Sequence, residues 1–389
     1  MRDGIIMKIG ILTLPLNTNY GGILQCYALQ SILRRMGHEV IILQRTFSQP
    51  KYSISTVWYY CKQLLKLAAG KPYCFKLYVS DEQNKIISQN IRPFIEKNIV
   101  PISRKCSNTK ELKNEIADMS LDAIVVGSDQ VWRVRYSPCI SDYYLGFLPG
   151  TNKIKRISYA ASFGTDIWEY SLCQTINCGK YLRLFDSISV REKSGVELCK
   201  KYFNMQAELV LDPTLLLNTK DYDSLLGECD ESDRQSRGLF CYMLDRTEDK
   251  MNFAKKLADC HRMFVFETMP ELETTPNNVD NDIKKCIYPS IEEWLSSFRK
   301  ASMVVTDSFH GTVFSIIFNK PFWVIGNTGR GLSRFESLLS LFGLQNRLLQ
   351  SLDTKTNNMA DEIDWEYVNK MRLSLSERSL SYLRKALIH

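Results

Sequence analysis

The sequence predicts an α/β protein with two Rossmann-like domains that face each other across a cleft. Its 389 residues are too many for one ordinary compact domain and suit two. Short apolar runs alternate with helical patterns in two successive series, and this alternation is typical of parallel sheets. We therefore expect an N-terminal domain over residues 1–185 and a C-terminal domain over residues 186–389.

The first series begins with a strand–helix–strand unit. Apolar residues predict strands over Lys8–Leu14 and Val40–Leu43, and helical periodicity from Ile23 to Met36 connects them. Further strands are expected at Leu121–Val126 and Ile157–Ala161. A unit of this kind places its two strands side by side and parallel, so the N-terminal domain should contain a parallel sheet.

An insertion at about residues 50–100 interrupts the first series. From Lys51 to Tyr78 there are five lysines, no acidic residue and many aromatic residues. Basic residues with Trp and Tyr suit the headgroup zone of a membrane or a surface on which carbohydrate stacks. A helical insertion that covers its own core is the alternative.

The second series is expected to build the C-terminal domain. Its predicted strands are Ser187–Val190, Leu209–Leu211, Leu239–Leu244, Met263–Glu267, Met303–Thr306 and Phe322–Ile325. Its predicted helices are Ser194–Tyr202, Lys250–Cys260, Ile291–Lys300, Gly311–Phe318 and Arg334–Phe342. A last helix, at about Glu366–Leu387, is expected to pack late and to cross back to the first domain.

Composition excludes several classes of function. The formal net charge of +7 is small and scattered, which argues against nucleic-acid binding. Twelve cysteines without a CxxC pair suggest reduced thiols, and no His, Asp and Cys residues have metal-ligand spacing. Without a signal-peptide pattern or an apolar run long enough to span a bilayer, we expect a cytoplasmic protein with no metal and no cofactor. Peripheral contact with the inner face of the membrane stays open.

The segment from Thr306 to Gly311 is the first candidate for chemistry. It follows a predicted strand and opens a helix, and a helix N-terminus binds anions such as phosphate or carboxylate. Gly311 permits close approach of an anion, and His310 could act as a general acid or a cationic anchor. Asp307 could handle an acceptor proton, or it could cap the helix instead.

Three arginines are expected to add positive charge to the same cleft. Arg191 ends a predicted strand and could bind a carboxylate or phosphate through two bonds, although an ion pair with Glu192 is the alternative. Arg330 and Arg334 flank the start of a helix in a loop made pliable by glycines. Either could supply a second contact to an anion.

Loops of the first domain suggest a sugar site. Asp129, Gln130 and Trp132 offer a carboxylate, an amide and a flat ring, which suit sugar hydroxyls and an apolar sugar face, although Ser128 or Asp129 could instead cap the next segment. Gly21 and Gly22 precede a helix, but neither GxGxxG nor GxxxxGKS is present, so nucleotide binding is weakly supported.

Six short segments, taken in this order, resemble the polysaccharide pyruvyl transferase family over most of residues 8–348. They are Asn19-Tyr20-Gly21-Gly22 with Gln25, Gly127-Ser128-Asp129-Gln130-Val131-Trp132, Tyr159-Ala160-Ala161-Ser162-Phe163-Gly164, Val190-Arg191-Glu192, Leu211-Asp212-Pro213-Thr214 and Thr306-Asp307-Ser308-Phe309-His310-Gly311. The resemblance implies a glycosyltransferase-B-like fold. It also implies transfer of pyruvate from phosphoenolpyruvate, as a ketal, onto a sugar of a bacterial exopolysaccharide, capsule or lipid-linked precursor.

This resemblance assigns the two sides of the site to the two domains. The donor is expected to contact Arg191, Ser308, His310, Gly311, Thr312, Ser162, Arg330 and Arg334. The acceptor is expected to contact Asn19, Tyr20, Gly21, Gly22, Gln25, Asp129, Gln130 and Trp132. We expect His310, Asp129 and Asp307 to be the catalytic residues, with His310 protonating the enol carbon.

One position departs from the family pattern. Relatives often carry an arginine two residues before the motif histidine, where this chain has Ser308, which brings no charge. We predict that Arg191 together with Arg330 or Arg334 supplies the missing charge. A glycosyltransferase that uses a nucleotide sugar and a non-catalytic carbohydrate-binding or assembly protein remain the alternatives. The acceptor sugar, its hydroxyl pair, any lipid carrier and the oligomeric state depend on features that these motifs do not describe.

Overall fold

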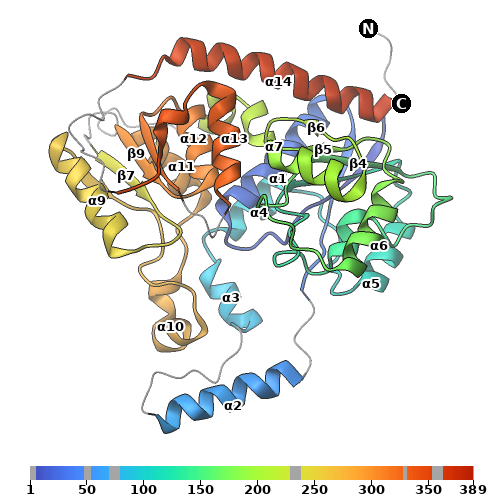
Figure 1. Cartoon of the computed structure of the whole chain (residues 1–389), viewed down its shortest axis with the longest axis horizontal. Helices are drawn as coiled ribbons and strands as arrows, with labels where there is room; N and C mark the ends of the chain where they lie inside the picture. Colours follow the sequence, from blue (N-terminus) through green and yellow to red (C-terminus); the bar gives the residue numbers. More distant parts are fainter. Residues whose placement is uncertain are drawn as a thin grey trace.

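Two parallel β-sheets with helices against them organise the chain (Figure 1). The computed structural model describes residues 6–47, 54–69, 79–227, 238–326, 331–352 and 362–388, with the backbone alone for residues 54–60. Within these residues the first sheet has the order β2-β1-β3-β4-β5-β6 and the second has the order β11-β10-β9-β7-β8. All the strand pairs are parallel.

Within the described residues the first sheet has six strands, of which β1 and β3 are central, apolar and buried. Its strands are β1 (Lys8–Leu12), β2 (Glu39–Leu43), β3 (Ala123–Asp129), β4 (Lys155–Ala161), β5 (Ser189–Val190) and β6 (Glu208–Leu209). In β1, Ile9 pairs with Val40 on one side and with Ala123 on the other, which fixes the register of the central strands. Every residue of β3 is buried, as a central parallel strand covered on both faces should be.

Helices cover this sheet and connect its strands. They are α1 (Tyr20–Arg35), α4 (Arg92–Asn98), α5 (Thr109–Ala117), α6 (Leu172–Leu182) and α7 (Lys193–Leu198). The side chain of Asn19 accepts a hydrogen bond from the backbone N–H of Gly22 and so caps the first turn of α1. This cap ends the loop that leads from the carboxyl end of β1 to α1, the edge at which functional loops of parallel sheets gather.

The second sheet is also parallel and is also covered by helices. Its strands are β7 (Gly238–Tyr242), β8 (Phe264–Phe266), β9 (Met303–Thr306), β10 (Phe322–Ile325) and β11 (Leu348–Leu349). The helices of this domain are α8 (Thr219–Asp223), α9 (Glu248–Cys260), α10 (Pro276–Asn281), α11 (Ile291–Lys300), α12 (Phe309–Ile317) and α13 (Leu332–Phe342). The most apolar of them, α12, is buried along its whole length.

The first sheet extends further along the chain than expected. Val190 of β5 pairs with Ala161 of β4 and with Leu209 of β6, so both short strands belong to the N-terminal domain. The boundary expected between residues 185 and 186 is therefore wrong, and the chain leaves the first sheet only after Leu209. Strands of two residues carry too little pattern to indicate which sheet they join.

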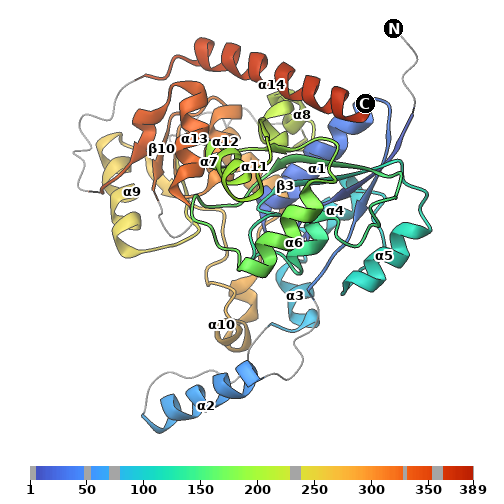
Figure 2. The ribbon, with the colours of Figure 1, turned by 45° about the vertical axis from the view of Figure 1, so that its right-hand side comes forward.

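The last helix, α14 (Trp365–Ile388), runs across the top of both sheets (Figures 1 and 2). The Tyr382 hydroxyl donates to the backbone carbonyl of Ser158 in β4 at 2.8 Å. The Ser379 hydroxyl accepts from the Leu211 N–H at 3.0 Å. The helix thus returns to the first domain after the chain has completed the second.

The insertion in the first domain contains helices α2 and α3, of which α3 packs against the second domain. Helix α3 (Asp81–Ile87) packs through Ile87 against Val279 of α10 and Cys286 of the 3-10 helix that follows it, Ile283–Cys286. The carbonyl of Ile87 accepts from the Tyr288 N–H at 3.0 Å. Helix α2 (Ile54–Ala68) extends away from both sheets (Figures 1 and 2). None of the helices in the described parts of the chain combines the length and the apolarity needed to cross a membrane.

Candidate functional site

A cavity of about 480 Å³ lies where loops of the two domains meet. Its walls follow the carboxyl ends of β1, β3 and β9, as expected for open parallel sheets. From the first domain it is lined by Asn17, Thr18, Asn19, Tyr20, Asp129, Gln130, Arg135 and Tyr136, among others. From the second it is lined by Tyr242, Asp307, Ser308, Phe309, His310 and Arg334, among others.

His310 occupies the first turn of α12 at the wall of this cavity. Ser308 is the N-cap of the helix, and its hydroxyl accepts a hydrogen bond from the Gly311 N–H at 3.3 Å. The imidazole lies so close to α1 that a Cβ on Gly21 would stand 2.0 Å from Nδ1 of His310. The family motif glycine Gly21 is therefore explained by the room that the histidine needs.

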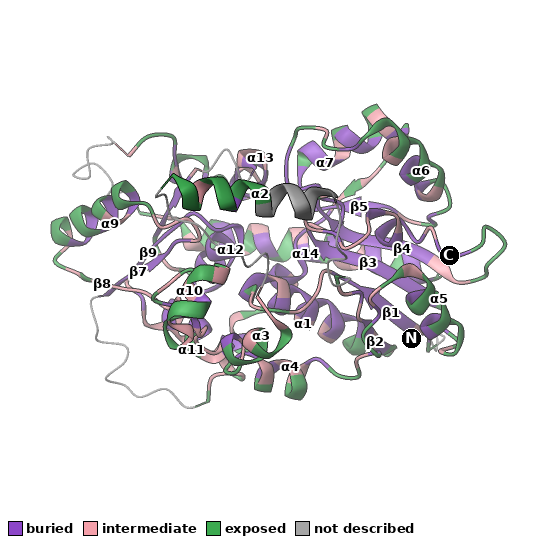
Figure 3. Ribbon diagram, turned by 90° about the horizontal axis from the view of Figure 1, so that it is seen from below, coloured by how far each residue is buried: buried purple, intermediate pink, exposed green. Residues whose placement is uncertain are grey.

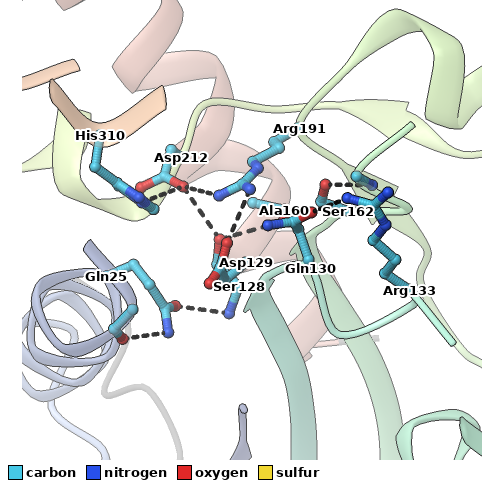
Figure 4. A network of polar contacts seen from close by, with 12 residues as sticks. Gln25, Ser128, Asp129, Gln130, Arg133, Ala160, Ser162, Arg191, Asp212 and His310 are labelled. Carbon is cyan, nitrogen blue, oxygen red and sulfur yellow. Dashed lines mark hydrogen bonds and ion pairs between the residues drawn. The ribbon is translucent and has the colours of Figure 1, made fainter. Parts of the chain in front are cut away.

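A buried polar network supports His310 from behind (Figure 4). Nε2 of His310 lies 3.6 Å from Oδ2 of Asp212, and the same oxygen receives Nη1 of Arg191 at 2.8 Å. The other oxygen of Asp212 accepts from the N–H and the hydroxyl of Thr214 at 3.1 and 2.7 Å. Asp212 and Thr214 lie in the Leu211–Thr214 motif, which brings the chain back across the inner end of the cavity.

The second guanidinium arm of Arg191 extends the network to Asp129. Nη2 of Arg191 donates to Oδ1 of Asp129 at 2.9 Å, and Nδ2 of Asn19 donates to Oδ2 at 3.3 Å. Asp129 has a φ of +66°, a left-handed backbone conformation that non-glycine residues rarely adopt. Arg191 thus binds one oxygen of the Asp129 carboxylate and Asn19 binds the other, which fixes this carboxylate at the cavity wall.

Arg191 does not line the cavity, contrary to the prediction that it binds the donor. Its side chain is fully buried, and both terminal nitrogens are occupied by carboxylates from distant parts of the chain. The guanidinium also lies over the ring of Phe309, 4.3 Å from its centroid. In this structure Arg191 positions two carboxylates and a cavity-lining ring.

Burial and charge shift the pKa values of this cluster in opposite directions. Burial by itself would raise the pKa of Asp212, but its contacts with His310 and Arg191 outweigh burial and hold that pKa well below its usual range. Burial raises the pKa of Glu192, although Arg191 and Arg334 oppose the shift. Burial, and then repulsion by Arg191, lower the pKa of Arg334 to about 10, so this guanidinium remains charged at neutral pH.

Asp307 lines the cavity, but its carboxylate is already engaged. Lys250 Nζ lies 2.6 Å from Oδ2, and the N–H groups of Leu244 and Asp245 donate to the two oxygens at 2.7 and 3.1 Å. Ser308 rather than Asp307 caps α12, so the alternative of a helix cap at Asp307 is wrong. This carboxylate ties the loops after β7 and β9 together, which does not fit the expected catalytic role.

Several predicted contact residues are buried away from the cavity. The Trp132 ring has no exposed surface, stacks on Tyr144 and donates through Nε1 to the carbonyl of Tyr143, so it cannot present a face to a sugar. The Gln25 side chain is held by Thr13, Gly22 and Ser128. Nor is the cavity lined by Gly21, Gly22, Ser162, Gly311 or Thr312, which we also expected to contact a substrate.

Of the remaining predicted residues, most reach the cavity. Asn19, Tyr20, Asp129 and Gln130 line it from the first domain, and Ser308, His310 and Arg334 line it from the second. Tyr20 also crosses to the second domain, where its hydroxyl donates to the Pro289 carbonyl at 2.8 Å. Arg330 lies outside the described residues.

Sequence reasoning missed two residues of the site. Asp212 was noted only as part of a motif, although its fixed place between two other motifs was a usable signal. Arg135 is an exposed arginine at the cavity, three residues beyond Trp132. Arg133, two residues before it, is instead buried and paired with Glu169 at 3.2 Å. Nothing in the spacing of the two arginines distinguishes the cavity residue from the buried one.

The described residues contain no group of three or more His, Cys, Asp or Glu side chains that could hold a metal ion.

Comparison of the whole sequence with protein families identifies one match. The model described as "Polysaccharide pyruvyl transferase" matches residues 19–329, which includes every motif of the site. The chain belongs to the polysaccharide pyruvyl transferase family. Membership in this family implies a transferase and supports pyruvyl transfer to polysaccharide. No curated protein sequence matches the chain.

Solved structures agree with the fold of this pyruvyl transferase family member. The glycotransferase of kitacinnamycin has a TM-score of 0.51 at 11% identity, over 98% of this chain and 100% of that one. A Listeria monocytogenes protein described as a UDP-N-acetylglucosamine 2-epimerase has a TM-score of 0.50 at 12% identity, over 98% and 91%. At these identities the likeness concerns the fold alone. It confirms the glycosyltransferase-B-like arrangement of two parallel-sheet α/β domains.

Proposed function

We propose that this protein transfers pyruvate from phosphoenolpyruvate onto two hydroxyls of one sugar in a polysaccharide or its precursor, forming a ketal. The observation that carries the proposal is the pairing of His310 with Asp212 at the cavity wall, where they adjoin Asp129. A protonatable group supported by a buried carboxylate is suited to acid catalysis. A second carboxylate lining the same cavity is suited to holding an acceptor hydroxyl.

The charges around the cavity support an anionic donor. Phosphoenolpyruvate carries a carboxylate and a phosphate, and Arg334, Arg135 and the N-terminal turn of α12 offer positive potential on the cavity wall. We propose that Arg334 and Arg135 replace the charge missing at Ser308. Arg191, which we expected to do so, would act indirectly through the carboxylates that it holds.

The proposed reaction begins with proton transfer from His310 to C3 of the donor, which leaves positive charge at C2. Oδ2 of Asp212, 3.6 Å from Nε2, positions the imidazole for this step. One sugar hydroxyl then forms a bond to C2 and loses its proton towards Asp129. The C2–O bond to phosphate breaks and phosphate leaves with the electron pair. The second hydroxyl then adds to C2 and gives its proton to the neutral His310. Phosphate and the ketal are the products.

Phosphate release in the presence of acceptor tests this assignment. His310→Gln should lower the rate by at least about 100-fold, the lower end of the contribution of a positioned general acid. His261→Gln is the matched control, because His261 ends α9 and does not line the cavity. The circular-dichroism spectrum should be unchanged in both. A near-wild-type rate for His310→Gln would remove its proposed role.

Ligand-dependent thermal stabilisation tests the donor. Phosphoenolpyruvate should raise the melting temperature and UDP or GDP should not, since a ligand stabilises only the protein that binds it. Stabilisation by UDP or GDP but not by phosphoenolpyruvate would favour the nucleotide-sugar glycosyltransferase. Stabilisation by oligosaccharide alone would favour the non-catalytic carbohydrate-binding protein.

A further inference from the structure

Helix α2 presents its apolar residues to solvent. In the part whose side chains are described, Leu64 and Leu65 are 54% and 72% exposed, while Gln63 is only 6% exposed. Cys61 and Ala68 are exposed too, so positions 61, 64, 65 and 68 form an outward stripe with the spacing of one helix face. A helix that packs on its own domain normally shows the opposite arrangement.

The charge of the insertion indicates what covers this stripe. The sequence from 51 to 78 contains five lysines and no aspartate or glutamate. Two of these lysines, Lys62 and Lys66, lie on α2, where Lys62 is exposed and Lys66 is half-buried. Exposed leucines beside lysines, in a stretch without acidic residues, complement a surface that has an anionic outer layer over an apolar interior. The headgroup layer of an anionic bilayer has this chemistry.

The insertion also joins both rims of the cavity. It starts just after Phe47, which lines the cavity and is 55% exposed. Its helix α3 is bound to the second domain beside Tyr288, another lining residue. In the view from below, α2 lies in front of the region between the two sheets (Figure 3), and Figure 1 shows it extending away from them. The insertion that carries α2 is therefore joined to the rest of the protein at the rims of the cavity.

We propose that α2 docks this protein on an anionic lipid surface, with the stripe from Cys61 to Ala68 in the headgroup layer and Lys62 and Lys66 against lipid phosphates. The docked protein takes its sugar acceptor from a lipid carrier in the same membrane. This last statement rests on the proposed function, whereas docking itself does not.

Vesicle flotation of the full chain tests docking. We expect the protein to float with vesicles of phosphatidylcholine and phosphatidylglycerol, and to bind vesicles of phosphatidylcholine alone at least about tenfold less, because each lysine near an anionic surface contributes severalfold to binding. Leu64→Glu/Leu65→Glu should lower binding to the anionic vesicles by roughly tenfold or more. Lys62→Glu/Lys66→Glu should lower it by a similar factor.

The matched control is Leu172→Glu/Ile176→Glu on α6. These side chains are 78% and 60% exposed and lie on one face of another helix. This variant should float like the wild-type protein. Equal flotation of the wild-type protein and Leu64→Glu/Leu65→Glu would overturn the proposal, as would equal binding to both kinds of vesicle. A dimer that becomes a monomer in Leu64→Glu/Leu65→Glu, without flotation of either, would assign the stripe to a second copy.

Phosphate release with a water-soluble acceptor separates this inference from the proposed function. It should be unchanged in Leu64→Glu/Leu65→Glu, because none of the substituted residues lines the cavity. With a lipid-linked acceptor in anionic vesicles, the same variant should be roughly tenfold slower. Equal rates of the wild-type protein and this variant with the lipid-linked acceptor would overturn the statement that the docked protein takes its acceptor from the membrane, and would leave docking itself unaffected.

Discussion

At the scale of single residues, the site depends on side chains that never reach the cavity. Arg191 holds Asp129 and Asp212, and Asp212 in turn holds His310. Two residues that line the cavity, Asp129 and His310, are therefore linked to a fully buried guanidinium. We expect Arg191 to affect the site through these contacts, although it does not itself line the cavity.

Replacement of Asp212 should reveal this dependence as a pH effect. Asp212→Asn leaves part of a buried charge uncompensated and should lower the free energy of unfolding by about 3 kcal/mol at neutral pH. Because the folded pKa of Asp212 is below its unfolded value, its stabilisation is present above about pH 4 and is lost as the pH falls further. Urea unfolding should show the two proteins converging in stability below that pH. A difference in stability that stays constant with pH would contradict a lowered pKa of Asp212 in the folded protein.

A methyl group at Gly21 should disturb catalysis more than folding. Its Cβ would stand 2.0 Å from Nδ1 of His310, so the imidazole must move by about 1 Å, a displacement that can cost about 100-fold in rate. Phosphate release by Gly21→Ala should fall by that order. Gly150→Ala is the control, because no atom lies within 4 Å of its added Cβ. A wild-type rate for Gly21→Ala would show that the histidine adjusts freely.

Much of this residue-scale picture lies beyond sequence reasoning. Asp129, Gln130 and Trp132 are neighbours in one motif, yet two line the cavity and the third is wholly buried. The difference depends on Tyr144, which stacks on the indole from another segment. Arg191 likewise donates hydrogen bonds to the carboxylates of Asp129 and Asp212, which are 62 and 21 residues away in the chain. Such partners become visible only when the fold brings them together.

At the scale of elements, the beginnings of α12 and α13 close the cavity against the first domain. Gly331, the N-cap of α13, has a φ of +87° and lies so close to the loop after β4 that a Cβ would stand 2.0 Å from the Gly164 carbonyl oxygen. Glycine at this position therefore allows backbone of the two domains to meet directly.

An alanine at Gly331 should force these loops apart. We expect Gly331→Ala to lower the free energy of unfolding by about 3 kcal/mol, since strain at positive φ adds to a clash with backbone. Gly343→Ala, at a φ of +69° with its nearest contact at an ordinary 3.5 Å, should lose only about 1 kcal/mol. Thermal unfolding would measure both. Equal losses would mean that the loops have room to separate.

Elements with strong patterns were predictable in place, whereas the sheet that the two shortest strands join was not. The apolar runs at β1, β3, β9 and β10 and the amphipathic helix α11 agree with their expected positions, because burial imposes a clear periodicity on them. The pair β5 and β6 contributes two residues each, and their sheet is decided by pairing with β4 rather than by local sequence. This is why the expected domain boundary fell one strand–helix unit too early.

At the scale of the whole molecule, α14 links the end of the chain to the first sheet. Tyr382→Phe removes one of the two hydroxyls that donate to the buried carbonyl of Ser158, the other being that of Ser189 at 2.9 Å, and should lower the free energy of unfolding by about 1–1.5 kcal/mol. Glu377→Ala on the same helix removes only an exposed ion pair with Arg384 and should change it by less than about 1 kcal/mol. Urea unfolding of both variants would check this. Equal effects would show that α14 is only loosely attached.

The volume of the cavity has a consequence for kinetics. About 480 Å³ lies in the range that accommodates a whole drug-sized ligand, so a three-carbon donor and one sugar ring have room there together. For the proposed reaction this favours a ternary complex in which pyruvate passes directly from one substrate to the other. Reciprocal plots of initial rate at several acceptor concentrations should then intersect, whereas parallel lines would indicate that the protein itself carries the pyruvyl group between two half-reactions.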